Sequence, residues 1–270
     1  MRKIITSNIP GIRSNLRRVM EHKQLIVTFA RRDLKIQYAQ TVLGITWSFV
    51  RPLIGLLIYT LFFSYLLNVN TGAVPYPLFA FSGMVCWYFF SFLVSNSGVS
   101  LRESQHMIKK IYFPKLILPL SKVLVGLVEF SIAIIILLCL MAVWGMVPGI
   151  MIILLPLVVL LNVIAGLSIG IWLSALTVRY RDFHHVIPYL VNFGIFLTPV
   201  FYPATLIPEE YYYIVYLNPM AGVVESMRWM LFSGPIPSLN FLWGFVPVFL
   251  LFFSGIYYFT KIENKIADIV

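Results

Sequence analysis

The chain has 270 residues, of which 60% are hydrophobic and 11% are charged, with a formal net charge of +10 and a mean hydropathy of +0.90. Soluble domains carry about 25% charged residues. This composition therefore excludes the soluble globular class and indicates a protein that faces lipid. Cys86 and Cys139 lie in apolar runs, and we interpret them as packing residues, neither a disulfide nor a metal site.

The N-terminal arm, residues 1–38, is predicted to be cytosolic. Its segment Asn15–Tyr38 mixes basic and apolar residues at roughly helical spacing, without an apolar run of 20 residues. This pattern favours an amphipathic helix that lies in the inner membrane interface. The alternative is a basic tail that only orients the first span.

Residues 39–270 are predicted to form an all-α membrane domain with six transmembrane helices, because about 20 apolar residues are needed to cross the hydrocarbon core. The predicted spans are Thr41–Leu67, Tyr76–Val99, Val123–Val147, Met151–Val178, Val186–Tyr202, which is short, and Asn240–Phe259. Between the last two spans, Pro203–Leu239 is rich in proline, and its apolar pieces are too short to cross. We expect re-entrant helices there, packed against protein.

The basic residues are distributed to one side of these spans. All of the 20 Lys and Arg residues except Arg51 and Arg228 lie in the arm, in the loop after the second span, around Arg179 and Arg181, or at the C-terminus. Basic loops stay in the cytosol, which predicts a multi-pass membrane protein with both termini cytosolic. The positive charge is explained by topology and anionic lipid, so no nucleic-acid partner is expected.

The loop Arg102–Lys122 is long for a connection between two helices. It combines cations with aromatic side chains, namely Lys109, Lys110, Lys115, Tyr112 and Phe113. A loop that only sets topology needs charge but no aromatic residues, so the combination favours a docking surface for a partner protein. The alternative is an interfacial loop whose aromatic rings lie at headgroup depth.

A second short cytosolic turn, "VRYRDFHH", connects the fourth and fifth spans. Arg179 or Arg181 can pair locally with Asp182 or stabilise the C-terminal end of the preceding helix. The alternative is a contact that transmits the motion of a partner. The neighbouring His184 and His185 are interpreted as solvated side chains.

Two charged residues, Arg51 and Glu129, lie within the predicted spans, where charges are often functional. Helical rise places both a short way inside the inner boundary. Three interpretations remain open: an ion pair between them, snorkelling of Arg51 to the headgroups, or direct contact of Arg51 with a substrate.

Six motifs occur in order along nearly the whole chain: "RRDLKIQYAQTVLGITWSFVRPL", "GMVCWYFF", "LRESQHMIKKIYFPKLILPLSK", "VRYRDFHHVIPYLV", "TPVFYP" and "NPM". With these motifs the chain resembles the permease subunits of bacterial polysaccharide ABC exporters, which handle O-antigen, capsule or teichoic acid. Arg51 departs from the pattern, because an apolar or small polar residue is expected before the Pro-Leu pair.

The resemblance implies two sets of functional residues. The first set would contact the ATPase and comprises Arg102, Lys109, Lys110, Tyr112, Phe113, Lys115, Arg179, Arg181 and Asp182. The second set would line a glycan channel and comprises Trp47, Arg51, Tyr59, Phe63, Phe193, Phe196, Phe201 and Tyr202. Aromatic faces suit the C–H surfaces of sugars.

The chain contains no G-x-x-x-x-G-K-[ST] motif, so ATP and Mg²⁺ are expected on a separate ATPase subunit. No catalytic residue, metal or cofactor is expected on this chain. The resemblance implies a homodimer with two ATPase subunits that moves a lipid-linked polysaccharide outward, as in lipopolysaccharide biosynthesis.

Two other classes are weighed against this exporter. A membrane enzyme that acts on lipid-linked sugars needs clustered carboxylates or histidines, whereas the acidic residues here are scattered. An ion-coupled secondary transporter or channel tends to show internal repeats and ionisable residues at the midplane, and only Glu129 comes near that description.

Overall fold

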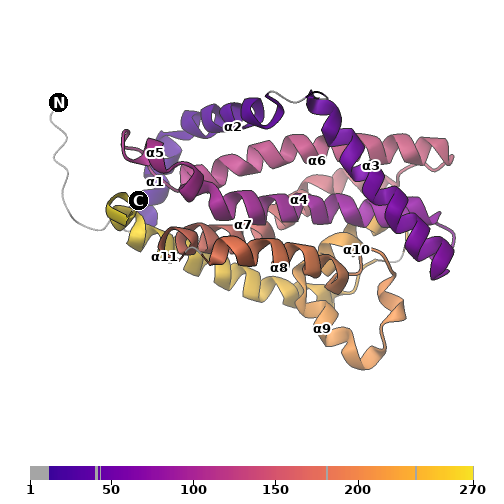
Figure 1. Ribbon diagram of the computed structural model, residues 1–270. Helices are drawn as coiled ribbons and strands as arrows, with labels where there is room; N and C mark the ends of the chain where they lie inside the picture. Colours follow the sequence, from indigo (N-terminus) through magenta and orange to yellow (C-terminus); the bar gives the residue numbers. More distant parts are fainter. Residues whose placement is uncertain (1–11, 40–41, 43, 181, 235, 270) are drawn as a thin grey trace.

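The computed structural model describes residues 12–39, 42, 44–180, 182–234 and 236–269. All regular secondary structure within these residues is helical (Figure 1), which confirms the all-α class. The α-helices are α1 (Ile12–Glu21), α2 (Lys23–Tyr38), α3 (Trp47–Tyr59), α4 (Tyr76–Glu103), α5 (Gln105–Ile108), α6 (Ile117–Val143), α7 (Leu155–Arg179), α8 (Phe183–Leu197), α9 (Tyr212–Leu217), α10 (Pro219–Phe232) and α11 (Phe245–Ile269). A π-helical turn, Thr60–Leu66, extends α3, and 3₁₀ turns precede α3, α7, α9 and α11.

Within the described residues, five helical segments are long and apolar enough to cross a membrane: Gly44–Leu66, Tyr76–Glu103, Ile117–Val143, Ile150–Arg179 and Leu239–Glu263. They match the first four predicted spans and the sixth. The predicted fifth span corresponds to α8, which is apolar but has only 15 residues. At 1.5 Å per residue α8 is about 22 Å long, shorter than a hydrocarbon core of about 30 Å. The count of six crossings therefore stays a prediction.

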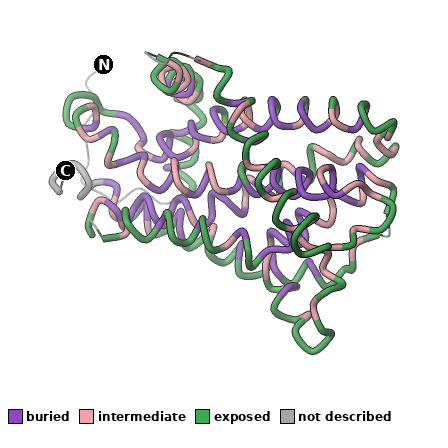
Figure 2. The backbone as a smooth tube through the Cα atoms, turned by 45° about the vertical axis from the view of Figure 1, so that its right-hand side comes forward, coloured by how far each residue is buried: buried purple, intermediate pink, exposed green. Residues whose placement is uncertain are grey.

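Helix α4 lies at the centre of the bundle, packed against α6, α7, α8 and α10. In its most apolar stretch 78% of the residues are buried, against 6% for the stretch that contains α3. Helix α3 crosses the outside of the bundle obliquely (Figure 1), and much of its length is exposed (Figure 2). The two helices are similarly apolar, so packing alone distinguishes them.

Helices α4 and α7 approach each other closely because α7 carries small residues at the contact. A Cβ atom at Gly166 would lie 2.7 Å from the Leu93 Cβ atom, and one at Gly170 would lie 2.8 Å from the Ser97 Cβ atom. Real Cβ contacts are not that short, so only glycine permits this spacing. The pair forms the tightest packed core of the bundle.

The N-terminal arm forms two helices where the pattern predicted one amphipathic helix. Helix α1 ends next to His22, whose ring nitrogen Nδ1 lies 2.8 Å from the carbonyl oxygen of Arg18. A side chain that bonds to the preceding turn competes with the continuation of the helix, which accounts for the break. Whether α2 lies in the membrane interface stays a prediction.

Helix α6 begins at Ile117, six residues before the predicted start of the third span at Val123. The loop before it is therefore shorter than the predicted loop Arg102–Lys122. The reason lies in Lys122, which is buried inside the helix with carboxylates around it. Its Nζ atom lies 3.0 Å from Asp33 Oδ2 on α2 and 3.5 Å from Glu103 Oε2 on α4. Sequence patterning assigned this lysine to a solvated loop because it could not show those partners.

The segment between α8 and α11 forms α9 and α10 at the two apolar pieces that were predicted to be short helices. The Asn218 side chain caps α10 by accepting a hydrogen bond of 3.0 Å from the Met220 N–H, and Pro219 occupies the first helical position. This is a favourable start for a helix. Helix α10 packs against α4 and α7; re-entry into the membrane stays a prediction.

Candidate functional site

The predicted docking loop lies at the end of the bundle that holds α1, α5 and the end of α11 (Figure 1). Its two aromatic residues have different environments. The Phe113 ring is buried and meets the Phe29 ring of α2 edge-on, with 5.3 Å between ring centroids. The Tyr112 side chain is 74% exposed, and Ile111 beside it is 59% exposed. Phe113 thus anchors the loop, and Tyr112 with Ile111 forms the surface.

The basic residues of the loop also divide into surface and anchoring groups. Lys109 and Lys110 are exposed, while Arg102 is half-buried. The Arg18 guanidinium of α1 donates a 3.0 Å hydrogen bond to the Tyr112 hydroxyl. The first helix therefore adds a cation to the same surface, which the sequence pattern did not assign to it.

A buried carboxylate, Glu263 of α11, joins three segments that are distant in the chain. Its Oε1 atom accepts a 2.7 Å hydrogen bond from the backbone N–H of Lys115, and its Oε2 atom accepts one of 2.7 Å from Asn15 Nδ2. Asn15 Nδ2 also lies 3.2 Å from Thr260 Oγ1. We call Asn15, Lys115, Thr260 and Glu263 the loop junction.

Apart from Lys115, the residues of the loop junction escaped sequence analysis. Glu263, Asn15 and Thr260 are each at least 95% buried, but no local pattern in the sequence marks them. The only signal was the position of a carboxylate after the last apolar span, between two lysines. A hydrogen bond from the Lys115 side chain to the Glu263 carbonyl oxygen adds a second tie between the loop and α11.

The second predicted ATPase contact connects α7 to α8. Arg179 is exposed, and its guanidinium lies over the Tyr180 ring at 5.3 Å from the centroid. Asp182 makes no ion pair with the described residues; its backbone carbonyl accepts from the N–H groups of His185 and Val186 at the start of α8. Arg181 lies outside the described residues. The proposed Arg179–Asp182 pairing is therefore not formed.

The predicted channel aromatics meet where the end of α3 contacts the turn after α8. The Tyr59 and Phe201 rings stack with centroids 3.9 Å apart, and the Phe63 ring stacks on Phe201 at 5.2 Å. Phe196 approaches Phe201 at 5.9 Å, and the Tyr202 hydroxyl donates to the Phe196 carbonyl oxygen. Phe201 is fully buried, so it packs the wall and does not present a surface.

Other predicted channel residues are exposed on α3 and α8. Trp47 is 37% exposed and Phe193 is 64% exposed. They lie among further exposed apolar residues on the same two helices, including Leu53, Ile54, Leu57, Ile58, Val186, Tyr189, Leu190 and Phe196. Two apolar helix faces are thus left without an intramolecular partner in the described chain.

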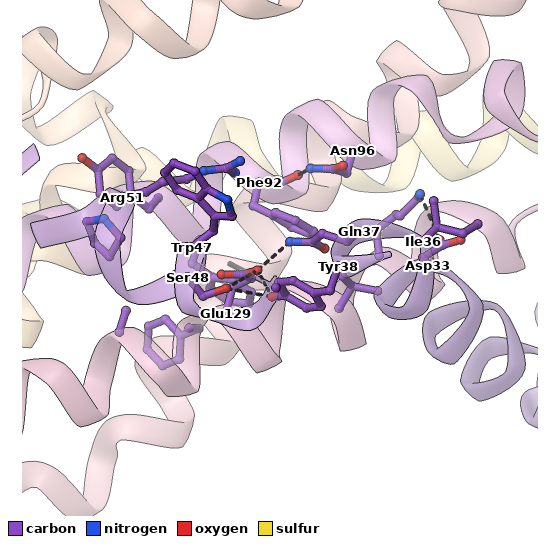
Figure 3. Close-up of a pocket in the computed structure, with 18 of the residues that line it drawn as sticks. Asp33, Ile36, Gln37, Tyr38, Trp47, Ser48, Arg51, Phe92, Asn96 and Glu129 are labelled. Atoms are coloured by element: carbon purple, nitrogen blue, oxygen red, sulfur yellow. Dashed lines mark hydrogen bonds and ion pairs between the residues drawn. The ribbon is translucent and has the colours of Figure 1, made fainter. Parts of the chain in front are cut away.

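A cavity of about 1000 Å³ lies among α2, α3, α4 and α6 (Figure 3). At its polar side, Glu129 of α6 accepts hydrogen bonds from Gln37 Nε2 at 2.6 Å, from Ser48 Oγ at 3.1 Å and from the Tyr38 hydroxyl. Burial and the Glu129 carboxylate raise the pKa of Tyr38 to about 12. The phenol therefore stays protonated and donates.

Arg51 also borders this cavity but makes no ion pair with any described carboxylate. Its guanidinium lies over the Trp47 ring at 5.6 Å from the centroid. The hypothesis of an Arg51–Glu129 ion pair is therefore wrong, because Glu129 takes its bonds from α2 and from Ser48 on α3.

Arg228 of α10 is a second buried charge that holds distant backbone. Its Nη1 atom donates to the Pro199 carbonyl oxygen and to Glu225 Oε1, at 2.7 and 2.8 Å, and its Nη2 atom donates to the Val200 carbonyl oxygen at 2.7 Å. The guanidinium also lies 3.5 Å from the centroid of the Phe79 ring. Glu225 and Arg228 stand three residues apart on one helix, a spacing that brings side chains together, whereas the backbone contacts depend on the tertiary fold.

Comparison with known proteins identifies the family. Residues 24–232 match the model of the ABC-2 type transporter family. The chain belongs to this family. The match confirms the family resemblance drawn from the six motifs and, with the five apolar helices, makes the chain a multi-pass membrane protein of a transport system. Within the described residues, no group of three or more His, Cys, Asp or Glu side chains could hold a metal ion.

Individual relatives extend the match over most of the chain. It is 29% identical over 225 residues to the O-antigen export system permease protein RfbA of Myxococcus xanthus, covering 82% of this chain and 85% of the relative. It is 28% identical over 248 residues to the protein of the same name from Klebsiella pneumoniae, covering 91% and 95%. It is 26% identical over 245 residues to the polysialic acid transport protein KpsM of Escherichia coli, covering 88% and 93%.

Proposed function

We propose that this chain is the permease subunit of an ATP-driven exporter that moves a lipid-linked, O-antigen-like polysaccharide outward across the bacterial inner membrane. The observation that carries the proposal is the similarity, over 82% of the chain or more, to proteins named for O-antigen export and polysialic acid transport. The ordered motifs and the apolar helices agree with it.

The driving subunit is a separate ATPase that binds ATP and Mg²⁺. The surface offered to the ATPase comprises Lys109, Lys110, Ile111 and Tyr112. Arg18 donates a hydrogen bond to the Tyr112 hydroxyl. An exposed aromatic and an exposed aliphatic side chain flanked by cations suit a protein interface, since Tyr and Arg are enriched at interface centres. Phe113 and the loop junction hold this surface against α2 and α11.

The orientation follows from the basic residues, which place the loop, the arm and the C-terminus in the cytosol. In this orientation α8 forms the fifth crossing together with the turn after it, and α9 and α10 return to the outer side. Such non-helical backbone is acceptable at membrane depth where protein buries it. In agreement, Thr198, Val200 and Phe201 are fully buried against their neighbours.

The assembly is a homodimer with two ATPase subunits. The exposed apolar faces of α3 and α8 are the surfaces that a second copy would cover, with Trp47 and Phe193 among them. A glycan channel along these helices would place aromatic side chains beside the sugar rings. Tyr59, Phe63 and Tyr202 would then position this wall by packing on or beside Phe201.

The experiment is a gene deletion with complementation. Deletion should leave the lipid-linked polysaccharide intact but inside the cell, and the gene on a plasmid should restore it at the surface. Inactivating ATP hydrolysis in the partner should reproduce the deletion. Continued surface display without a working ATPase would contradict the proposal and favour an ion-coupled transporter, whereas loss of synthesis would favour an enzyme.

A further inference from the structure

The cavity among α2, α3, α4 and α6 shares Trp47 with the exposed apolar face of α3 but is otherwise lined by residues that the proposed function does not use. Its volume of about 1000 Å³ is at the upper end of the range found for small-molecule sites. It lies where the arm helix α2 meets α6 and the beginning of α3. A group bound there would touch both the arm and the bundle.

The wall of the cavity is amphipathic. Its apolar part comes from α4 and α6 and consists of Val85, Phe89, Phe92, Val125, Phe130 and Ala133. Its polar part carries Arg51 and Glu129 together with Gln37, Tyr38 and Ser48. Figure 3 shows the last three gathered around the Glu129 carboxylate. A ligand that fills it needs a polar head and a hydrocarbon body.

Of the charged groups that line the cavity, two remain available to a ligand. Arg32, Asp33, Lys122 and Glu103 bind one another in a chain of ion pairs. Arg51 has no ion pair with the described residues, and its guanidinium lies over the Trp47 ring.

Glu129 supplies the other available group. It uses a single oxygen, Oε1, for all three of its donors, and Oε2 has no hydrogen-bond partner among the described residues. One guanidinium and one carboxylate oxygen thus remain to bind a ligand with charges of both signs.

We propose that the cavity binds one zwitterionic glycerophospholipid with a phosphoethanolamine headgroup. Arg51 binds the phosphate, as arginine does in charge-assisted, often bidentate contacts. Glu129 Oε2 accepts from the primary ammonium, and an acyl chain lies along Phe89, Phe130 and Ala133. The bound lipid joins α2, α3 and α6 at the corner where the arm meets the bundle.

The charge balance selects this headgroup. A lipid without an ammonium group would bring its phosphate near the Glu129 carboxylate and leave Oε2 unpaired. A pyrophosphate-linked substrate would bring still more negative charge to a single available arginine. The inference depends on the cavity and not on which polymer is exported, so it can fail while the proposed function holds.

The test uses the full-length chain with its ATPase partner in vesicles that contain phosphatidylethanolamine carrying a photoreactive group in one acyl chain. After irradiation, mass spectrometry should find the label on peptides from α4 and α6 that include Phe89, Phe130 or Ala133. Excess unlabelled phosphatidylethanolamine should abolish this labelling. Excess phosphatidylglycerol should compete about tenfold less well or worse.

Variants separate the cavity from lipid that only surrounds the protein. Arg51→Gln should reduce the labelling about tenfold, and Arg51→Lys should restore part of it because the charge returns. Ala133→Phe, which fills the apolar wall and leaves the polar groups intact, should reduce it as well. Arg31→Gln removes an exposed arginine of α2 that does not line the cavity and should leave the labelling unchanged.

Three outcomes would overturn the proposal. One is equal labelling of the wild type and Arg51→Gln by phosphatidylethanolamine. A second is equal competition by phosphatidylglycerol, which would assign the site to any phospholipid. A third is labelling confined to α3 and α8. Thermal stability of each variant, measured in parallel, identifies any loss that comes from unfolding.

Discussion

The two ends of the bundle hold their irregular backbone with buried charges of opposite sign. Near α1 and α5, the Glu263 carboxylate accepts from the Lys115 N–H and from the Asn15 side chain. At the turn after α8, the Arg228 guanidinium donates to the carbonyls of Pro199 and Val200. Glu263 is an anion because the groups around it are N–H donors that need an acceptor. Arg228 is a cation because the groups around it are carbonyl oxygens that need a donor.

The two junctions differ in what surrounds them. Arg228 is enclosed by α4, α10 and the turn after α8, and its neighbours are also buried. Glu263 is equally buried, but the loop that it holds leads directly to exposed Ile111 and Tyr112. Loss of Arg228 should therefore damage the fold, whereas loss of the Glu263 charge should mainly damage coupling.

Arg228→Met should have the largest effect on the free energy of unfolding, a loss of about 3 kcal/mol or more. It leaves the Pro199 and Val200 carbonyls buried without donors, and each unsatisfied group costs about 1–3 kcal/mol. Thermal unfolding of the detergent-purified protein measures it. Glu225→Gln is the matched control, since Glu225 is 26% exposed and its change should cost less. Equal stability of Arg228→Met and the wild type would contradict the role of this junction.

Glu263→Gln should cost about 1–3 kcal/mol, because glutamine has one acceptor oxygen where the carboxylate used two. The amide NH₂ group would face a donor, either the Lys115 N–H or the Asn15 amide. We expect ATP-driven export to fall by more than the loss of folded protein. Glu21→Gln, which removes an exposed carboxylate paired with Arg17, should change neither stability nor export. Normal export by Glu263→Gln would show that the junction only packs.

In delipidated, detergent-purified protein, Arg51→Gln and Glu129→Gln should be additive within about 0.5 kcal/mol in a double-mutant cycle of unfolding, because side chains that share neither a bond nor a ligand couple weakly. The cycle extends the comparison of the two junctions to two charges that are not paired with each other. Glu129→Gln alone should cost more than Arg51→Gln, since it weakens the bonds from Gln37, Tyr38 and Ser48. A coupling energy of several kcal/mol would instead indicate an ion pair between Arg51 and Glu129.

Reversing the charge of Lys109 and Lys110 together should change the free energy of unfolding by no more than about 0.5 kcal/mol, because both side chains are exposed and surface changes seldom cost more. Association with the ATPase should nevertheless weaken, as co-purification with a tagged partner would measure. Lys23→Glu, a change in the arm outside the loop, serves as the control. Unchanged association and transport would exclude docking by this loop.

The sequence predicted the features that depend on composition and on local pattern. Apolar length located five of the spans, and short apolar pieces located α9 and α10. Ordered motifs predicted the family that the comparison confirms. The assignment of Lys122 to a loop was wrong, because its partners Asp33 and Glu103 lie on other helices.

The junctions could not be predicted, because each depends on contacts between residues far apart in the chain. Glu263 and Asn15 are separated by 248 positions, and neither stands in a motif. In the sequence Arg228 is an isolated cation with Glu225 three residues before it, but its carbonyl partner Val200 lies in a turn 28 residues earlier. Helical periodicity carries no information on such pairs.

The close contact of α4 with α7 gives the bundle a mechanical property. Because the two helices approach so closely that a Cβ atom at Gly166 or Gly170 would not fit between them, we expect them to tilt together. Helix α4 has 28 residues, which corresponds to about 42 Å at 1.5 Å per residue. Its C-terminal end leads into the docking loop, and its N-terminal half contacts Arg228 through Phe79. A tilt of about 5° around the loop end would move the far end of α4 by about 4 Å, so a force that the proposed ATPase exerted on the loop would displace the opposite end of the bundle.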